Sequence, residues 1–474
     1  MTSDLLKFVN IDQTYPDKRD AKLRSKDFSE IFEEYMRPTA IEQASRCSQC
    51  GVPFCQIHCP LQNNIPDWLM MAAQGRLQEA YELSSMTNNM PEVCGRICPQ
   101  DRLCEGNCVI EKGFKSVTIG SVEKFITDYA FDQGWIKPIL PSREKEQSVG
   151  IIGAGPGGLA AAEELRKLGY QVTVYDRYDR IGGLLIYGIP NFKLEKDLVE
   201  RRANLLKESG VTFKLKCEIG NQMSFDEVYN SHDALLMATG VYKARDIEIK
   251  GSELDNIFPA MDYLTASNRV GLGDSVENFS NGKLNAKDKH VVVLGGGDTA
   301  MDCVRTAKRQ GALSVKCLYR RDRLNMPGSM REVQHAEEEG IEFVWLTAPE
   351  QYKGLNSVSA IDAKKMRLGI ADSSGRQSPE VVKDSMHKIP CDLAIKAFGF
   401  DPEDIQKSFK LPELNITGWG TVSIDFITKM TSVKGVFAAG DIVRGASLVV
   451  WAIRDGRDAA LEIDKYIKTN LKNL

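Results

Sequence analysis

The sequence predicts an α/β chain in which two Rossmann-like dinucleotide-binding domains follow a helical domain. Two stretches, 148–176 and 289–321, each read as apolar strand, glycine-rich turn, helix, glycine and second strand, which is the half-unit of that fold. Residues 1 to about 145 show short helical patterns without clear strand alternation. Eight of the twelve cysteines lie between Cys47 and Cys108, which indicates metal or redox chemistry in a reducing compartment.

The overall composition is that of a globular protein of about three domains. The 474 residues are 42% hydrophobic and 27% charged, and the formal net charge of −4 gives no basic excess for nucleic acid or anionic membrane. The first ten residues do not resemble a secretion signal, and no run of about 18 apolar residues is present. We expect a cytoplasmic protein with neither nucleic acid nor membrane as a partner. The acidic run 337–339 is interpreted as a solvated helix face.

The first glycine-rich turn matches the pattern Gly-x-Gly-x-x-Gly at Gly153, Gly155 and Gly158. The first glycine permits the tight turn, the second lets the backbone approach a pyrophosphate, and the third allows close helix packing. The N-terminus of the following helix offers free N–H groups to a phosphate. Asp176 ends the second strand, where an acidic side chain binds a ribose 2′-hydroxyl. These four residues predict a dinucleotide site.

The second glycine-rich turn is a Gly-x-Gly-x-x-Ala variant in the same strand-to-helix setting. Its second strand ends at Arg320 and Arg321, where an NAD-specific fold places Asp or Glu. Guanidinium groups there suit the extra phosphate of NADPH through charge-assisted hydrogen bonds. The other candidate binding residues of this turn are Gly295, Gly297, Asp298 and Thr299.

Two dinucleotide sites in one chain favour hydride transfer from a nicotinamide to a flavin. The order of motifs resembles the two-domain flavoprotein reductases, in which the first site holds FAD and an inserted domain holds the pyridine nucleotide. The sequences around Thr239-Gly240 and Gly440-Asp441 resemble two further flavin motifs of that superfamily. That resemblance implies a discontinuous FAD domain, with Asp441 near the ribityl chain and flavin phosphate.

The expected domain boundaries follow from these motifs and from a linker. Residues 137–147 are rich in proline and charge, as linkers are. We place the helical domain at 1–146, the FAD-binding domain at 147–284 and 396–474, and the NADPH-binding domain at 285–395.

The cysteine-rich stretch offers an exit for electrons from the flavin. No cysteine lies between Cys108 and Cys217, so the redox-active pair of a disulfide reductase is missing from its usual place. The spacing Cys47-x2-Cys50-x4-Cys55-x3-Cys59-Pro, with a second Cys-Pro step at Cys98, favours iron–sulfur ligation. Structural zinc is the alternative, although only one C-x2-C knuckle is present.

Three segments are similar to the small, or beta, subunits of bacterial NADPH-dependent glutamate synthase. They read Arg-Cys-Ser-Gln-Cys-Gly-Val-Pro-Phe-Cys-Gln-Ile-His-Cys-Pro at 46–60, Asn-Ile-Pro-Asp-Trp at 64–68, and Pro-Glu-Val-Cys-Gly-Arg-Ile-Cys-Pro-Gln-Asp-Arg-Leu-Cys-Glu-Gly-Asn-Cys at 91–108. The segment 181–196 extends the match and adds Gly183 and Leu184 to the candidate cofactor-binding residues.

This resemblance implies two [4Fe–4S] clusters with crossed ligation. The first cysteine set is Cys47, Cys50, Cys55 and Cys108, and the second set is Cys59, Cys98, Cys104 and Glu123. Glu123 stands where the related dihydropyrimidine dehydrogenase has a glutamine, and Cys94 is a spare thiol with a structural role.

The function implied by the resemblance is the input of electrons to glutamate synthase. NADPH reduces FAD, the clusters pass the electrons on, and a large (alpha) subunit makes glutamate from glutamine and 2-oxoglutarate. No acid–base residue is named as catalytic, because the protein's task is orientation and tuning of the cofactors. Two alternatives are a relative that delivers electrons to ferredoxin or another acceptor, and a redox-silent scaffold that keeps the clusters only as structural staples.

Overall fold

The computed structural model describes residues 4–373, 375 and 377–471. Its N-terminal part is helical, as expected, and the first named strand begins at Ser148. The helix Ile119–Asp132 buries Val122, Ile126 and Ala130 at the spacing of one helix face, and the first two share a core cluster with Trp68. The helices of this part are the 3₁₀ helix Asp4–Val9, α1 (Ala21–Arg24), α2 (Arg37–Ala44), α3 (Phe54–Ile57), α4 (Ile65–Ala73), α5 (Leu77–Ser85), α6 (Pro91–Ile97), α7 (Glu111–Phe114) and α8 (Ile119–Asp132).

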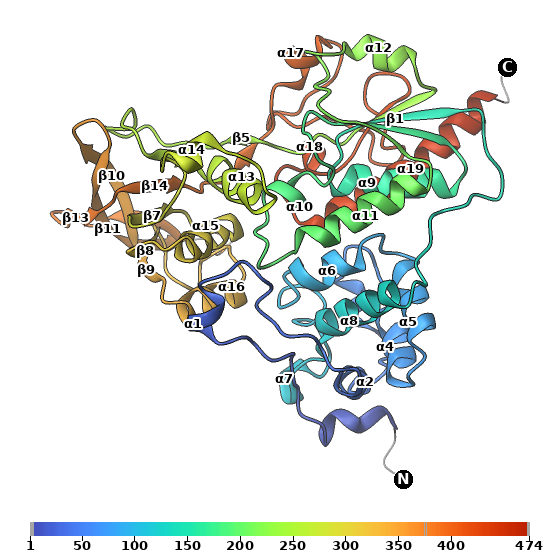
Figure 1. The fold of residues 1–474 in the computed structure, drawn as a ribbon, viewed down its shortest axis with the longest axis horizontal. Helices are drawn as coiled ribbons and strands as arrows, with labels where there is room; N and C mark the ends of the chain where they lie inside the picture. Colours follow the sequence, from blue (N-terminus) through green and yellow to red (C-terminus); the bar gives the residue numbers. More distant parts are fainter. Residues whose placement is uncertain (1–3, 374, 376, 472–474) are drawn as a thin grey trace.

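The first glycine turn follows β1, which lies near α9 and α19 in Figure 1. The parallel sheet that contains β1 has the order β16-β4-β1-β2-β3. Strand β16 pairs with β4, so the C-terminal part of the chain returns to this sheet. The strands are β1 (Ser148–Ile152), β2 (Gln171–Tyr175), β3 (Thr212–Lys214), β4 (Ala234–Met237) and β16 (Val436–Ala438). The helices are α9 (Pro156–Lys167), α10 (Leu184–Tyr187), α11 (Lys196–Glu208), α12 (Phe225–Asn230), α17 (Ile405–Phe409), α18 (Asp441–Arg444) and α19 (Val449–Leu471).

The second glycine turn belongs to a separate parallel sheet of order β6-β14-β7-β8-β9. Its strands are β6 (Ile257–Pro259), β7 (His290–Leu294), β8 (Ser314–Tyr319), β9 (Glu342–Trp345) and β14 (Leu393–Lys396), and its helices are α13 (Ala260–Gly271), α14 (Glu277–Ser280), α15 (Asp298–Arg309) and α16 (Met330–Glu338). Strand β6 pairs with β14 and lies before residue 285, the expected start of this domain. We therefore propose that the second unit also includes β6 and α13.

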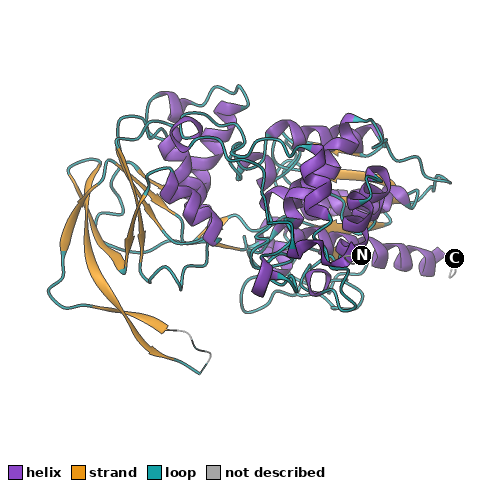
Figure 2. Ribbon diagram, turned by 90° about the horizontal axis from the view of Figure 1, so that it is seen from below, coloured by secondary structure: helices purple, strands orange, loops and turns teal. Residues whose placement is uncertain are grey.

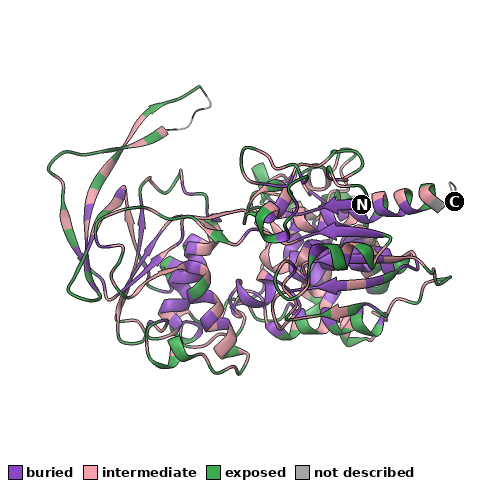
Figure 3. Cartoon of the chain, turned by 90° about the horizontal axis from the view of Figure 1, so that it is seen from above, coloured by how far each residue is buried: buried purple, intermediate pink, exposed green. Residues whose placement is uncertain are grey.

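A second, antiparallel sheet flanks this unit and ends in a long two-stranded arm (Figure 2). It consists of β10 (Thr347–Gly354), β11 (Val358–Ala371), β12 (Gln377–Val381) and β13 (His387–Pro390). Two short strands, β5 (Lys243–Ala244) and β15 (Phe400–Asp401), pair where the chain crosses between the two units. Buried residues concentrate on the parallel sheets and their helices, whereas the arm is largely exposed (Figure 3). No helix in the described part of the chain is long and apolar enough to cross a membrane.

In the acidic run 337–339, Glu337 and Glu338 are exposed as expected, but the prediction of a solvated face was wrong for Glu339. Glu339 is buried and accepts hydrogen bonds from Arg305 and Arg309 of α15. Arg24 of α1 also reaches it, at 3.2 Å, and pairs with Glu338 at 2.6 Å. A local charge count could not show this, because one of the cations comes from more than 300 positions earlier in the chain.

Candidate functional site

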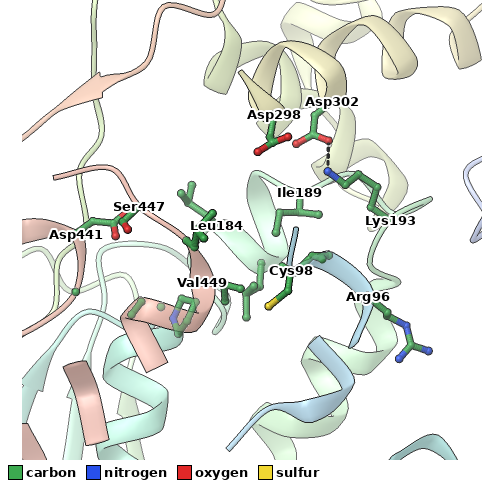
Figure 4. A pocket seen from close by; sticks show the side chains of 18 of the residues that line it. Arg96, Cys98, Leu184, Ile189, Lys193, Asp298, Asp302, Asp441, Ser447 and Val449 are labelled. Atoms are coloured by element: carbon green, nitrogen blue, oxygen red, sulfur yellow. Dashed lines mark hydrogen bonds and ion pairs between the residues drawn. The ribbon is translucent and has the colours of Figure 1, made fainter. Parts of the chain in front are cut away.

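A cavity of about 950 Å³ lies where the helical part and both nucleotide-binding units meet. This volume is at the upper end of the range for ligand and cofactor sites, roughly 300–1,000 Å³. Asp298 and Asp302 approach from α15, Leu184 and Asp441 lie on the side of the first unit, and Cys98 lies on the wall formed by the helical part (Figure 4). The site is therefore assembled from all three parts of the chain.

The first glycine turn has the close packing and the open face that its sequence predicts. Gly153 has a φ of +116°, and a Cβ there would overlap the carbonyl oxygen of Ala238. A Cβ on Gly158 would overlap the carbonyl oxygen of Gly153. No atom of the described residues lies within 4 Å of the Cβ position of Gly155, which lines the cavity at the start of α9. The turn thus offers an unobstructed backbone to a phosphate.

Asp176 lies beside this turn and lines the same cavity. Its carboxylate accepts hydrogen bonds from the backbone N–H groups of Ala154, at 2.7 Å, and Tyr178, at 2.8 Å. Burial raises the pKa of Asp176, and the two backbone donors act against that rise. A carboxylate has about four lone-pair sites, so it can still accept from a ribose hydroxyl. Ribose binding remains a prediction, while fixing the glycine turn is an additional role.

The remaining residues assigned to the flavin surround the cavity or support its wall. Gly183 has a φ of +56°, and a Cβ there would lie 2.9 Å from the Cα of Gly155, so two loops meet at this point. The hydroxyl oxygen of Thr239 is buried and has no hydrogen-bond partner among the described residues, as expected of a group that binds a polar ligand. Burial raises the pKa of Asp441 to about 6. The other lining residues are Leu184, Gly240 and Gly440.

The second glycine turn repeats the pattern of the first. Gly295 has a φ of +146°, and its Cβ position would overlap the carbonyl oxygen of Ala397. The Cβ position of Gly297 faces open space at the start of α15. Asp298 accepts a hydrogen bond from the backbone N–H of Ser329 at 2.8 Å, and Thr299 follows it on the helix. The open backbone at Gly297 and the N-terminus of α15 that follows it fit the phosphates of a second dinucleotide.

Arg320 and Arg321 follow strand β8 directly and lie outside the lining of the large cavity. Arg320 is exposed and has no ion pair within the described residues. Arg321 is half-buried, and its Nε has no hydrogen-bond partner among the described residues. Arg323, by contrast, pairs with Glu337 at 2.6 Å. The first two guanidinium groups are thus the ones available to a ligand phosphate.

The first cysteine set encloses a small apolar cavity, whose lining includes Leu69 and Val117. Burial raises the pKa of Cys47 to about 11 and that of Cys55 to about 12, and the nearby Cys108 adds to both shifts. Four thiols in such surroundings are deprotonated when they bind a metal, so their chemistry fits a cluster. Within the described residues, no three His, Cys, Asp or Glu side chains converge closely enough for a single metal ion.

The second set adjoins the first and reaches the large cavity. Burial raises the pKa of Cys59 to about 11, and Glu123 adds to that shift. A hydrogen bond to Cys94, then burial and the charge of Glu123, raise the pKa of Cys98, which also lines the large cavity. Burial raises the pKa of Cys104, with contributions from both Cys59 and Glu123. These four candidate ligands therefore lie together.

Glu123 is buried on α8, and burial raises its pKa to about 8. The amide groups of Asn88, at 3.1 Å, and Asn63, at 3.4 Å, donate to its Oε1 atom. The Cys94 thiol is buried and lies 3.7 Å from Oδ1 of Asn88. Glu123 is thus an interior carboxylate beside three thiols, although its isolated sequence pattern is that of an exposed helix residue.

A cluster of charges at the cavity was missed by sequence analysis. Lys193 pairs with Asp302 at 2.9 Å and with Glu332 at 3.5 Å, which joins the two nucleotide-binding units (Figure 4). Burial raises the pKa of Asp302 to about 6, and Lys193 acts against that rise. The only signal in the sequence is that Lys193 lies in the segment 181–196 that extends the family match.

Comparisons with known proteins match the helical part of the chain and its nucleotide-binding part to two different family models. Residues 24–135 match the family model "Dihydroprymidine dehydrogenase domain II, 4Fe-4S cluster". Residues 147–456 match the model "Pyridine nucleotide-disulphide oxidoreductase". The glutamate synthase [NADPH] small chain of Azospirillum brasilense is 64% identical over 465 residues, which cover 98% of this chain and 96% of that one. The chain belongs to the family of glutamate synthase small chains.

Members of this family differ widely in sequence. The small chain of Escherichia coli strain K12 is 42% identical over 467 residues, covering 97% of this chain and 98% of that one. Among solved structures, FprA from Mycobacterium tuberculosis in complex with NADPH has a TM-score of 0.58 at 17% identity, covering 69% of this chain and 86% of that one. That likeness confirms the two-unit fold, and the family identifies the chain as an NADPH-dependent oxidoreductase.

Proposed function

We propose that this chain is the electron-input subunit of an NADPH-dependent glutamate synthase. NADPH binds at the second glycine turn, FAD binds at the first, and two [4Fe–4S] clusters bind the two cysteine sets. The proposal is supported by the family to which the chain belongs and by the separate match of its helical part to a 4Fe–4S domain.

The observation that carries the proposal is the position of Cys98. It lines the large cavity together with Gly155, Thr239 and Asp441 of the flavin-type turns. It also belongs to the second cysteine set, which adjoins the first through Cys104 and Cys55. Redox groups held at these places would form one chain, from the nucleotide units to the surface of the helical part.

When bound, NADPH supplies a hydride, FAD accepts it and releases single electrons, and the clusters carry those electrons onward. The protein's own residues hold and orient the reactants. Gly155 and Gly297 present open backbone to phosphates, and Asp176 fixes the first turn. Lys193 holds α15 against the first unit through Asp302, which keeps the two glycine turns in one relative orientation.

The acceptor of the electrons is a large (alpha) subunit that makes glutamate from glutamine and 2-oxoglutarate. All three parts of this chain are assigned to electron transfer, so hydrolysis of the glutamine amide and reduction of the imine fall to that partner. The family name, glutamate synthase small chain, supports this division of labour.

The test is to tag the chain in its native cells, purify it without oxygen, and measure NADPH oxidation at 340 nm. We expect oxidation to require glutamine and 2-oxoglutarate together, and the large subunit to co-purify. A matched Cys98→Ser preparation should retain FAD but lose this activity.

The alternative is delivery of electrons to ferredoxin or another acceptor. A preparation that contains the large subunit, yet consumes NADPH only when ferredoxin or a dye is added, would contradict the proposal. The putative oxidoreductase AegA of Escherichia coli strain K12 is 41% identical over 454 residues, so this alternative needs the direct test.

A further inference from the structure

Two buried asparagines converge on the carboxylate of Glu123. The amide nitrogen of Asn88 lies 3.1 Å from Oε1 of Glu123, and that of Asn63 lies 3.4 Å from the same oxygen. Both asparagines are at most 2% exposed. Asn63 follows the Cys59-Pro60 step, and Asn88 lies in the turn before α6. The two asparagines come from different loops, so their convergence is a feature of the folded chain.

The orientation of each amide is fixed by an obligatory donor on its other side. Oδ1 of Asn88 accepts from the backbone N–H of Met90 at 3.0 Å. Oδ1 of Asn63 accepts from the indole N–H of Trp68 at 3.1 Å. Backbone and indole N–H groups can only donate, so the oxygen of each amide must face them. The NH₂ group of each asparagine must then face Glu123, and neither amide can be reversed without losing a buried bond.

The amides of Asn88 and Asn63 fix the orientation of the Glu123 carboxylate because both donate to the same oxygen. Both amides donate to Oε1, and among the described residues no amide donates to Oε2. Helix α6, which is capped at its C-terminus by Cys98, packs closely on α8, because a Cβ on Gly95 would lie 2.7 Å from the backbone nitrogen of Lys124, the neighbour of Glu123. Asn63 also lies in the loop that carries Cys59, four positions after it, and the carbonyl oxygen of Cys59 accepts from the backbone N–H of Gln62 at 2.8 Å.

We propose that Asn63 and Asn88 are positioning residues that hold the carboxylate of Glu123 in the orientation in which it binds the second iron–sulfur cluster. The inference rests on the proposed function, because it needs a cluster at the second set. Partners that orient a metal ligand commonly change metal affinity about 10- to 100-fold when they are removed. The asparagines would therefore set how firmly this cluster is held and at what potential it is reduced.

Asn89 provides a matched control next to Asn88 in the sequence. It is equally buried, but its amide donates to Glu164 at 2.7 Å and accepts from Arg457 at 2.8 Å. It thus makes the same kinds of bond to a different carboxylate, at the contact between the helical part and the first unit. Changes at Asn89 test the effect of a buried asparagine at this turn without touching Glu123.

The experiment compares full-length chains purified without oxygen. Asn88→Asp and Asn63→Asp keep the shape and the Oδ1 acceptor but turn a second acceptor toward Glu123, and Asn88→Ala removes the donor without adding charge. Asn89→Asp and Asn89→Ala are the controls. Each protein is assayed for iron and sulfide per FAD, for the rate of iron loss to a chelator, and for the potential of each cluster by EPR-monitored titration.

We expect iron loss from the Asn88 and Asn63 variants to be about tenfold faster or more. The potential of the second cluster should shift, while FAD content and the signal of the first cluster remain those of the wild type. If these variants match the Asn89 controls, or if they lose FAD and both clusters together, the positioning role is overturned while the proposed function stands. A wild-type chain that holds no second cluster would overturn the proposed function and this inference together.

Discussion

Replacement of Arg320 and Arg321 by alanine tests whether this loop selects NADPH over NADH. The two guanidinium groups end strand β8 of the second unit, and neither is engaged in an ion pair within the described chain. NADH lacks the 2′-phosphate, so loss of these groups should weaken only the reaction with NADPH.

The expected magnitude follows from the surroundings of each side chain. A hydrogen bond to a charged group contributes about 1.5–3 kcal/mol, which is roughly 10- to 150-fold in affinity. Arg320 is exposed, so solvent screening places it near the lower end, about tenfold. Arg321 is half-buried with an unpaired Nε, so its effect should be the larger. Because the two side chains are neighbours that would share one phosphate, their effects should not simply add, and the double variant should lower kcat/KM for NADPH by at least as much as the larger single effect, about tenfold or more.

The assay measures kcat/KM for NADPH and for NADH with an artificial electron acceptor, which removes dependence on the large subunit. Arg323→Ala is the control, because it removes one positive charge from the same loop but its guanidinium group is already paired with Glu337. A double variant whose preference for NADPH stays within about twofold of this control would refute the assignment of the phosphate site.

Three further substitutions test other parts of the site. In Gly155→Ala the new Cβ meets no atom of the part of the chain that the structure describes, so this variant should fold but purify with about tenfold less FAD. In Gly158→Ala the Cβ overlaps the carbonyl oxygen of Gly153, so this variant should also have a lower thermal midpoint. Absorbance at 450 nm and thermal unfolding distinguish the two. Burial lowers the pKa of Lys196 from its ordinary value of 10.5 to about 7 in the folded chain. Between these two pH values the unfolded chain binds a proton at Lys196 that the folded chain does not. The free energy of unfolding should therefore rise with pH across this window. Lys196→Met should flatten that rise, and parallel slopes in thermal unfolding from pH 7 to 10 would contradict it. Cys94→Ser should retain both clusters, because a hydroxyl can replace the thiol beside Asn88. Cys98→Ser should lose about half of the iron, because Cys98 is expected to ligate one of the two clusters. The iron content of the two purified variants shows whether each cysteine is a ligand.

The local parts of the fold were predictable because their signals are short in range. An apolar strand, a glycine turn and a helix occupy neighbouring positions, and the structure places β1 and α9, and likewise β7 and α15, as expected. The start of the second unit was harder to locate, because β6 has only three residues and its partner β14 lies more than 130 positions later. Pairing over such a distance has no signature in a single sequence.

The candidate site shows the same limit at the level of side chains. Glycines and cysteines could be named in advance because their spacing carries chemistry. Asn63, Asn88 and Lys193 could not, because a polar residue in a loop gives no sign of the carboxylate it will meet. The prediction for the acidic run failed at Glu339 for the same reason, because the ion-pair partners of Glu339 come from α1 and α15.

The N-terminal segment makes long-range contacts that bear on function and that no local sequence pattern indicates. Arg24 binds Glu339 in the second unit, and Tyr15 bonds both Arg331 of that unit and Glu105, the neighbour of Cys104. The segment therefore connects the nucleotide unit to the loop that carries a second-set cysteine. The Arg24–Glu339 and Tyr15–Arg331 contacts join the helical part to the second unit, and Lys193–Asp302 joins the two nucleotide-binding units. Movement of the second unit away from the flavin site would therefore break all three, at a cost of several kcal/mol. Hydride transfer and electron exit are therefore expected to occur with the two nucleotide units held in one arrangement.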